Sequence, residues 1–383
     1  MASIAVGGSV AQRVGYGGHA WAFLQYLLGF RLLGYEVVFI DYLTSGMATD
    51  ESGRPSPAAR ARSIRWFAQE MRNAGLEDSS ALLLDGNDES VGLSRAEVLE
   101  RVARSQFLLN VMGFLTDEEI LDAAPRRVFL DIDPGFGQMW RELGLADPFH
   151  GHDDFVTIAE NIGQPDCAIP TCGLPWITTR PPVDLESWRT ARGGERITSV
   201  ASWRGPYGPV EYDGRSYGLR VHEFRKFTEL PGLTGERFEV ALDIDPSDRH
   251  DVELLKRGEW ALVDPELVAG STDRYMKYIR SSRAELTIAK AMYVDTRSGW
   301  FSDRSACYLA SGKPVLAQDT GFTDNYPVGN GLLSFSDLDE AVAGIAEIRS
   351  DWESHSRVAR TIAEEYFDSR KVLGALLRKL GAA

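Results

Sequence analysis

A histidine that follows two glycines is the residue of this chain best suited to acid–base chemistry. His19 begins an apolar segment of helical spacing, residues 19–34. The ordinary pKa of histidine lies near neutrality, so such a residue can take a proton from a hydroxyl group. A base of this kind needs a carboxylate to orient it, and Asp131 and Asp133 lie at the end of a predicted strand. We predict His19 and Asp133 as catalytic residues; a histidine bonded to the backbone and two turn-forming aspartates are the ordinary alternatives.

A second polar group stands at the start of another predicted helix, in the stretch SDRS. The first turn of a helix has backbone N–H groups without partners, and these donors attract phosphate together with the aligned peptide dipoles. Ser302 and Ser305 add hydroxyl donors, and Arg304 adds a charge-assisted contact. This pattern predicts a diphosphate site at residues 302–305.

Two more side chains are candidates for the same ligand. Lys290 closes a predicted strand, and ligands of open α/β sheets bind at the carboxyl ends of the strands. Trp300 has a flat ring that can stack on a nucleobase, with a place in the core as the alternative.

Two series of alternating strands and helices must position these side chains. Apolar runs bounded by polar turns predict buried strands, and helical periodicity predicts the helices between them. The first series has strands at 3–8, 36–43, 106–114, 127–133 and 155–161, with helices at 19–34 and 116–124. The second has strands at 196–203, 237–245, 260–265, 284–290 and 313–320, with helices at 221–230, 251–258, 273–283 and 303–311. The alternation predicts an α/β fold with two Rossmann-like domains.

The two series are joined by a segment rich in proline, residues 172–188. Its prolines, Pro175, Pro181 and Pro182, predict a stiff connector without helix. After residue 340 the pattern predicts long helices up to the end of the chain. We therefore expect domains at 1–178 and 190–350, and helices at 351–383 that return to the first domain.

Length and charge exclude several classes of protein. A chain of 383 residues is too long for one ordinary core. The formal net charge is −15, which argues against a nucleic-acid partner but leaves room for a local basic pocket. Three cysteines without a repeating spacing indicate a reducing compartment. The longest apolar stretch is interrupted by Gln25 and Arg31, so we expect neither a signal peptide nor a membrane span, and a cytoplasmic location.

Several common site motifs are missing. The stretch HGHDD (150–154) is better explained as a solvated loop than as a metal site, and no cofactor is implied. The chain has neither a nucleophile elbow nor a phosphate loop. Its first glycine-rich turn matches the dinucleotide fingerprint poorly, which weighs against a dehydrogenase.

Two longer motifs carry a resemblance to a known family. GYGGHAWAFLQYLLGFRLLGYEVVFI (15–40) resembles the first turn, helix and strand of many nucleotide-sugar transferases. LASGKPVLAQDTGFTDNYPVGNGLLSF (309–335) is similar to their donor half, in which a helix of small residues ends at a Gly-Lys-Pro-Val turn. With the two-domain pattern, the chain resembles glycosyltransferases of the GT-B fold, in which two Rossmann-like domains face each other across a cleft and helices close the C-terminus.

The resemblance implies further site residues. Arg204 stands where the family often has a basic residue facing the diphosphate, and Asp324 and Asn325 stand where members hold sugar hydroxyls. An ordinary surface arginine and a turn-forming pair are the alternatives. Gly299 and Cys307 occupy the positions of the two glutamates of one retaining branch, so the resemblance leaves the stereochemistry and the sugar open.

The implied function is transfer of a sugar from a nucleoside diphosphate sugar to a small-molecule acceptor, such as a natural product. Two alternatives stay open at this point. One is a non-catalytic protein of this fold that binds a nucleotide sugar or a protein partner, because the acidic motif is missing. The other is a nucleotide-sugar epimerase. The number of subunits is not predicted.

Overall fold

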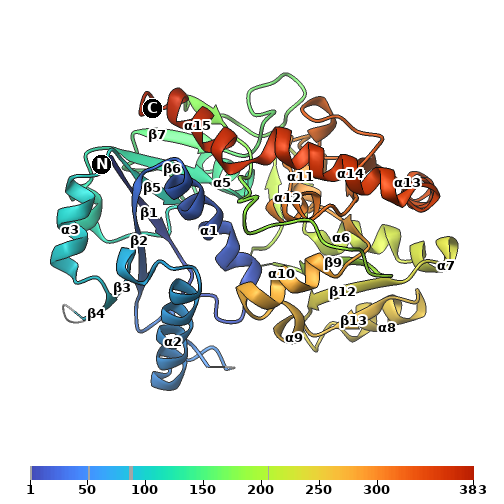
Figure 1. Ribbon diagram of the computed structural model, residues 1–383, viewed down its shortest axis with the longest axis horizontal. Helices are drawn as coiled ribbons and strands as arrows, with labels where there is room; N and C mark the ends of the chain where they lie inside the picture. Colours follow the sequence, from blue (N-terminus) through green and yellow to red (C-terminus); the bar gives the residue numbers. More distant parts are fainter. Residues whose placement is uncertain (1, 51, 86–88, 206) are drawn as a thin grey trace.

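A computed structural model describes residues 2–50, 52–85, 89–205 and 207–383. Two β-sheets, each with helices on both faces, form the two halves of the molecule (Figure 1). This arrangement confirms the predicted α/β fold with two Rossmann-like domains. The two sheets lie within residues 1–178 and 190–350, and domain limits at these residues remain a prediction.

The sheet of the first half has eight strands in the order β4-β3-β2-β1-β5-β6-β7-β8. All its strand pairs are parallel except that of β3 with the edge strand β4. The strands are β1 (Ser3–Gly8), β2 (Glu36–Leu43), β3 (Ser80–Leu84), β4 (Ser90–Gly92), β5 (Leu108–Val111), β6 (Arg127–Asp131), β7 (Asp154–Thr157) and β8 (Trp176–Thr178). Strand β8 lies within the predicted proline connector, so the first sheet extends one strand further than the sequence indicates.

The sheet of the second half has six parallel strands in the order β13-β12-β9-β14-β15-β16. The strands are β9 (Ile197–Ser202), β12 (Phe238–Asp243), β13 (Ala261–Val263), β14 (Ala284–Thr287), β15 (Val315–Gln318) and β16 (Leu332–Phe335). A separate antiparallel hairpin joins β10 (Val210–Tyr212) to β11 (Arg215–Tyr217). In each sheet the strand order reverses beside the first strand, and a ligand crevice forms at such a reversal.

Helices cover both sheets. The first half has α1 (Gly17–Leu32), α2 (Pro57–Asn73), α3 (Arg95–Ala103), α4 (Glu118–Ala123), α5 (Phe136–Glu142) and the short η1 (Glu77–Ser79). The second half has α6 (Arg220–Phe224), α7 (Leu230–Thr234), α8 (Arg249–Arg257), α9 (Pro265–Ala269), α10 (Thr272–Arg280), α11 (Ala291–Asp295), α12 (Asp303–Ala310), η2 (Arg225–Phe227) and η3 (Phe322–Asp324). The chain ends with α13 (Leu338–Ser350), α14 (Trp352–Ile362), the π-helical η4 (Ala363–Phe367) and α15 (Ser369–Lys379).

Helix α1 has apolar residues on nearly every side, and other elements cover nearly every side of it. Its first turns contact α10 of the second half, and its later turns contact α15. Gly29 allows α15 to approach, since a Cβ atom there would lie 2.5 Å from Leu373. Figure 1 shows the red C-terminal helices running from the second half back to the first. Helix α1 is therefore a central element on which both halves and the C-terminus meet.

Candidate functional site

A cleft of about 910 Å³ lies between the two halves. Its first wall is formed by the loop after β1, the start of α1 and the segments that follow β5 and β6. Its second wall is formed by the segments that follow β9, β12 and β14 and by the start of α12. Both walls thus consist mainly of the carboxyl ends of parallel strands, where the fold places its ligand sites. The predicted residues that line it are His19, Asp133, Arg204, Lys290, Trp300, Ser302 and Arg304.

One ion pair crosses this cleft. Lys290 Nζ lies 2.6 Å from Asp133 Oδ2 and 2.8 Å from Oδ1, and the hydroxyl of Tyr293 donates a hydrogen bond to the same carboxylate. Lys290 follows β14 and Asp133 follows β6, so each residue lies at the carboxyl end of a strand in its own sheet. The ammonium group also lies 5.1 Å from the centre of the Phe136 ring. The pair connects the two walls of the cleft. It also means that the positive charge of Lys290, which faces the cleft, is already paired with a carboxylate.

A second contact joins the walls at the glycine turn before α1. The hydroxyl of Tyr16 donates a hydrogen bond of 2.9 Å to Asp243, and burial and this carboxylate raise the pKa of Tyr16 to about 12. A Cβ atom on Gly17 would lie 2.1 Å from the carbonyl oxygen of Ser271, and one on Gly18 would lie 2.8 Å from the Tyr275 ring. The two glycines therefore let the second half approach the start of α1.

His19 faces the cleft, but its surroundings differ from those predicted. Its Nε2 lies 3.1 Å from both the carbonyl oxygen and the hydroxyl of Ser9. Burial lowers the pKa of His19 to about 4, so the ring is neutral at physiological pH. The expected carboxylate partner was wrong: Asp133 pairs with Lys290, and Asp131 accepts hydrogen bonds from Gln138 and Thr157. Burial raises the pKa of Asp131 to about 6.

Arg204 and Arg220 supply two further positive charges to the second wall. Arg204 is half exposed, and its Nε donates a hydrogen bond of 3.0 Å to Asp248. Arg220, which the sequence analysis did not single out, donates hydrogen bonds to the carbonyl oxygens of Ile288 and Ser202. Burial and the neighbouring Arg304 lower the pKa of Arg220 to about 10, which still leaves it charged. The local pattern at residue 220 contains no signal for this role, because the residue reaches the cleft only through the tertiary fold.

The start of α12 faces the cleft as predicted, with Ser302 at the cap position and its neighbour Asp303 on the cleft wall. Burial raises the pKa of Asp303, a carboxyl group that the sequence analysis did not single out. Arg304 lines the cleft, but its guanidinium is bound internally, 2.6 Å from Glu285 Oε1 and 2.7 Å from the carbonyl oxygen of Val200. Arg304 is therefore not a free cation in this structure, and its role as a phosphate contact stays a prediction.

Ser305 and Trp300 also differ from expectation. Ser305 is fully buried and shares a hydrogen bond with Thr287, so its hydroxyl does not reach the cleft. Trp300 touches the cleft but is only 7% exposed and stacks on Tyr293 with ring centres 4.2 Å apart, which leaves little room for a nucleobase.

Asp324 and Asn325 lie outside the cleft, in the seam between the two halves. Asp324 pairs with Arg297, and Asn325 donates a hydrogen bond of 2.8 Å to Asn161. Neither residue lines the cleft, and Asn325 is part of the contact between the two halves, so their role as ligands of sugar hydroxyls stays a prediction.

The hairpin of β10 and β11 follows Tyr207, which lines the cleft. Before it, Tyr207 of the second half lies with its ring 4.9 Å from Trp140 and 5.4 Å from Phe136, both on α5 of the first half. The hairpin strands contribute Val210 and Tyr217 to the same apolar cluster. This cluster forms a further point at which the two halves meet.

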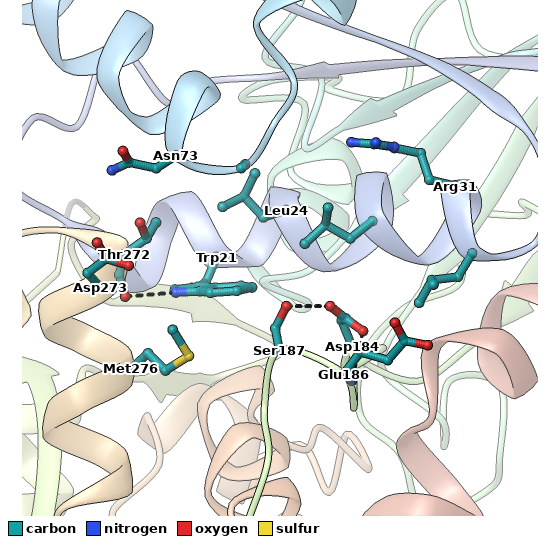
Figure 2. Close-up of a pocket in the computed structure, with 13 residues that line it drawn as sticks. Trp21, Leu24, Arg31, Asn73, Asp184, Glu186, Ser187, Thr272, Asp273 and Met276 are labelled. Atoms are coloured by element: carbon teal, nitrogen blue, oxygen red, sulfur yellow. Dashed lines mark hydrogen bonds between the residues drawn. The ribbon is translucent and has the colours of Figure 1, made fainter.

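A second cavity of about 540 Å³ lies on another face of α1 (Figure 2). Trp21 and Leu24 form its floor, and Trp21 donates a hydrogen bond of 3.0 Å to the carbonyl oxygen of Thr272. Asp184 lies at its edge and accepts a hydrogen bond from Ser187. No residue singled out in the sequence lines this cavity, so the cleft is the candidate site.

Comparison with solved structures identifies the architecture. HepE from Anabaena in complex with UDP aligns with a TM-score of 0.56 and 11% identity over 100% of both chains. An alpha-glucosyltransferase in complex with UDP aligns with a TM-score of 0.59 and 11% identity over 100% of both chains. This chain has the GT-B fold. A sucrose-phosphate synthase from Thermosynechococcus elongatus also aligns, with a TM-score of 0.52 and 11% identity over 100% of both chains.

The GT-B fold expected from the two sequence motifs is thus confirmed. No protein-family model and no curated protein matches the sequence. Within residues 2–50, 52–85, 89–205 and 207–383, no three His, Cys, Asp or Glu side chains come together as a metal site would require. None of the helices in that part of the chain has the length and apolar character needed to cross a membrane.

Proposed function

We propose that this protein is a glycosyltransferase that moves a sugar from a nucleoside diphosphate sugar to a small-molecule acceptor. The observation that carries the proposal is the set of positive groups on one wall of the cleft. Arg204, Arg220 and Lys290 face it beside the start of α12. Cations and unpaired backbone N–H groups at the carboxyl ends of strands are the groups that bind a diphosphate.

The ligands of the structural neighbours support this assignment. HepE was solved with UDP, with UDP and glucose, and with UDP-glucose, and the alpha-glucosyltransferase with UDP and with UDP-glucose. We therefore take UDP and UDP-glucose as the first ligands to test. We assign the diphosphate to Arg204, Arg220, Lys290 and the cap residue Ser302.

The first wall of the cleft is proposed to hold the acceptor. It carries His19 beside the apolar side chains of Met112, Phe114 and Ile132. The cleft volume suits a nucleotide sugar together with a small acceptor. The alpha-glucosyltransferase was also solved with DNA, but a net charge of −15 disfavours a phosphate backbone as partner of this chain. We therefore propose a small molecule as the acceptor.

Donor binding is tested by calorimetric titration with UDP, ADP and GDP. We expect UDP to bind, and Arg204→Gln to bind it roughly tenfold less tightly, since a charge-assisted hydrogen bond is lost. Arg249→Gln is the matched control, because Arg249 is an exposed arginine on α8 that does not line the cleft. Failure of all three nucleotides to bind would refute the proposal.

Turnover is tested by release of UDP from UDP-glucose and from other UDP-sugars with a panel of hydroxylated acceptors. Product formation supports a transferase, and NMR of the product gives its anomeric configuration. Tight binding of every donor without any turnover would instead favour the non-catalytic alternative, and a changed free sugar nucleotide would favour an epimerase.

A further inference from the structure

Two arginines of the first half face the cleft without a bonding partner. Arg13 lies in the loop between β1 and α1, and Arg62 lies on α2. Within the described part of the chain, neither guanidinium has a hydrogen bond or an ion pair. The other cleft cations are all engaged, Arg204 with Asp248, Lys290 with Asp133, Arg304 with Glu285, and Arg220 with two carbonyl oxygens. Both side chains are exposed to solvent, and two unpaired arginines in one cleft of a protein of net charge −15 offer positive charge to an anionic ligand.

The loop that carries Arg13 is held in place by hydrogen bonds. The backbone N–H of Arg13 donates to the carbonyl oxygen of Val10 over 3.2 Å, and that of Ala11 donates to Asp41 over 2.6 Å. The indole N–H of Trp66 on α2 also donates to Val10, over 3.2 Å. Because of these bonds to β2 and α2, the loop presents Arg13 from a fixed backbone.

Arg62 is directed to the same loop by the geometry of α2. It precedes Trp66 by four residues, which places the two side chains on one face of the helix. Trp66 contacts the loop at Val10, and Arg62 lines the cleft one helical turn before that contact. The two arginines thus come from different elements and approach one region of the first wall.

The position of Arg13 is close to the proposed reaction centre. Burial is the main influence on the pKa of both His19 and Tyr207, and the positive charge of Arg13 is a smaller influence that lowers both values. Arg13, His19 and Tyr207 also line the same cleft. A ligand group bound to Arg13 would lie in the same cleft as His19.

Carboxylates on the opposite wall could pair with Arg13 and Arg62 in place of an anionic ligand. Asp264 and Glu266 line the same cleft from the second half, and a tighter closure would bring Arg13 and Arg62 toward them. Neither forms an ion pair with these arginines in this structure. A purely structural role in closure predicts that the two arginines affect the binding of neutral and charged ligands equally.

We propose that Arg13 and Arg62 recognise an anionic group, a phosphate or a carboxylate, on the acceptor. This inference rests on the proposed glycosyltransferase function and names the chemical class of its acceptor. Guanidinium groups bind both anions through paired hydrogen bonds. In the transfer, an acceptor hydroxyl oxygen bonds to the anomeric carbon as the bond from that carbon to the diphosphate oxygen breaks. The hydroxyl proton passes to the base or to the departing diphosphate, and the anionic group stays unchanged.

The inference is tested by calorimetry on the full chain saturated with UDP, so that the donor cations are already occupied. The probes are glucose 6-phosphate, glucuronate and glucose, which separate phosphate, carboxylate and neutral ligands. We expect at least one anionic probe to bind more tightly than glucose. In Arg13→Gln and Arg62→Gln that preference should fall roughly tenfold or more, and in the double variant it should disappear.

Arg65→Gln is the matched control, because Arg65 is exposed on the same helix and does not line the cleft. It should leave the preference unchanged, and UDP affinity should be the same in every variant. The inference is overturned if glucose 6-phosphate and glucuronate bind no better than glucose, or if the double variant keeps the preference. If UDP itself does not bind, the proposed function fails, and the same three probes on the free protein still decide whether the two arginines bind an anion.

Discussion

Asp133 of the first half and Lys290 of the second form an ion pair across the cleft, with 2.6 Å between Nζ and Oδ2. Both side chains are largely shielded from solvent, so salt weakens the pair less than it would a surface pair. A diphosphate that binds Lys290 has to compete with Asp133. If the diphosphate binds Lys290 as proposed, donor binding would be linked to the relative position of the two walls.

Asp133→Asn is expected to strengthen UDP binding. Removing the carboxylate charge leaves Lys290 available to the diphosphate, and we expect a gain of roughly three- to tenfold in affinity. Lys290→Gln should weaken UDP binding by a similar or larger factor. Calorimetric titration measures both, with Lys256→Gln as an exposed control outside the cleft. If Asp133→Asn binds UDP more weakly than wild type, Asp133 supports the donor site rather than competing with it.

Gly17→Ala is expected to separate the two halves. The added Cβ atom would meet the carbonyl oxygens of Ser271 and Ala269 at 2.1 and 2.7 Å, so the backbone of the second half must move. We expect a loss of about 1–3 kcal/mol in the free energy of unfolding. Chemical denaturation measures the loss, and small-angle scattering with and without UDP measures the opening.

Gly232→Ala is the control for that change, since nothing lies within 4 Å of its added Cβ atom. It should be neutral or slightly stabilising, because alanine is the better helix former. Equal stability of Gly17→Ala and wild type would show that the domain contact at α1 is not as close in solution.

Arg304→Met is expected to lower the free energy of unfolding strongly and to change the affinity for UDP only slightly. It leaves Glu285, which is completely buried, without its ion-pair partner, at a cost of about 3–5 kcal/mol. Replacing both residues, as Arg304→Met with Glu285→Gln, should recover part of that loss. Denaturation of the four proteins gives the coupling energy. A large loss of UDP affinity with unchanged stability would return Arg304 to the donor site.

Much of the fold can be predicted from the sequence because parallel strands buried on both faces are continuous apolar runs. All ten predicted strands correspond to strands of the structure, for example residues 196–203 to β9 and 284–290 to β14. The prediction missed four strands of the two sheets, which are β3, the edge strands β4 and β8 of the first sheet, and the edge strand β16 of the second. It also missed the hairpin of β10 and β11, two strands of three residues each that pack against the other half.

The site was less predictable than the fold, because its contacts join distant parts of the chain. Lys290 and Asp133 were each recognised at the end of a strand, but no local pattern shows that they pair. The polar start of α12 correctly predicted a helix end at the cleft, whereas the partner that binds Arg304 internally lies on β14, where Glu285 is hidden in an apolar run. A polar residue next to a site can serve the ligand or the fold, and only its tertiary partner distinguishes the two.

The stability of the protein is expected to depend on pH through Asp41. This carboxyl group is completely buried, and burial raises its pKa to about 7, although it accepts a hydrogen bond from Ala11. A raised pKa means that stability is fully present below about pH 4, where the carboxyl is protonated in both states. It is lost as the pH rises toward about 7, because the unfolded chain releases the proton first.

Asp41→Asn removes this titration and keeps an acceptor for Ala11. Relative to the variant, wild type should lose on the order of a few kcal/mol between pH 4 and 7, and nothing more above pH 8. Urea denaturation of both proteins at each pH gives the difference. Asp131 titrates in both proteins, so its contribution cancels. A difference that does not vary with pH would mean that Asp41 is ionised throughout.

The role of His19 is expected to show in the pH dependence of turnover. Burial lowers the pKa of this ring to about 4, so it is already neutral at pH 5 and the rate should show no inflection near 6.5 from this residue. We expect His19→Ala to keep its UDP affinity and to release UDP from UDP-glucose about 10²-fold more slowly, the lower end of the range for loss of a base. We expect a loss at the lower end of that range because His19, with its lowered pKa, is a weak base. Proton transfer is most effective when the pKa of the base lies near the working pH. His250→Gln, on the exposed helix α8, should behave as wild type. Full turnover by His19→Ala would exclude His19 as the base, and an inflection near pH 6.5 that vanishes in this variant would show that the bound donor restores its ordinary pKa.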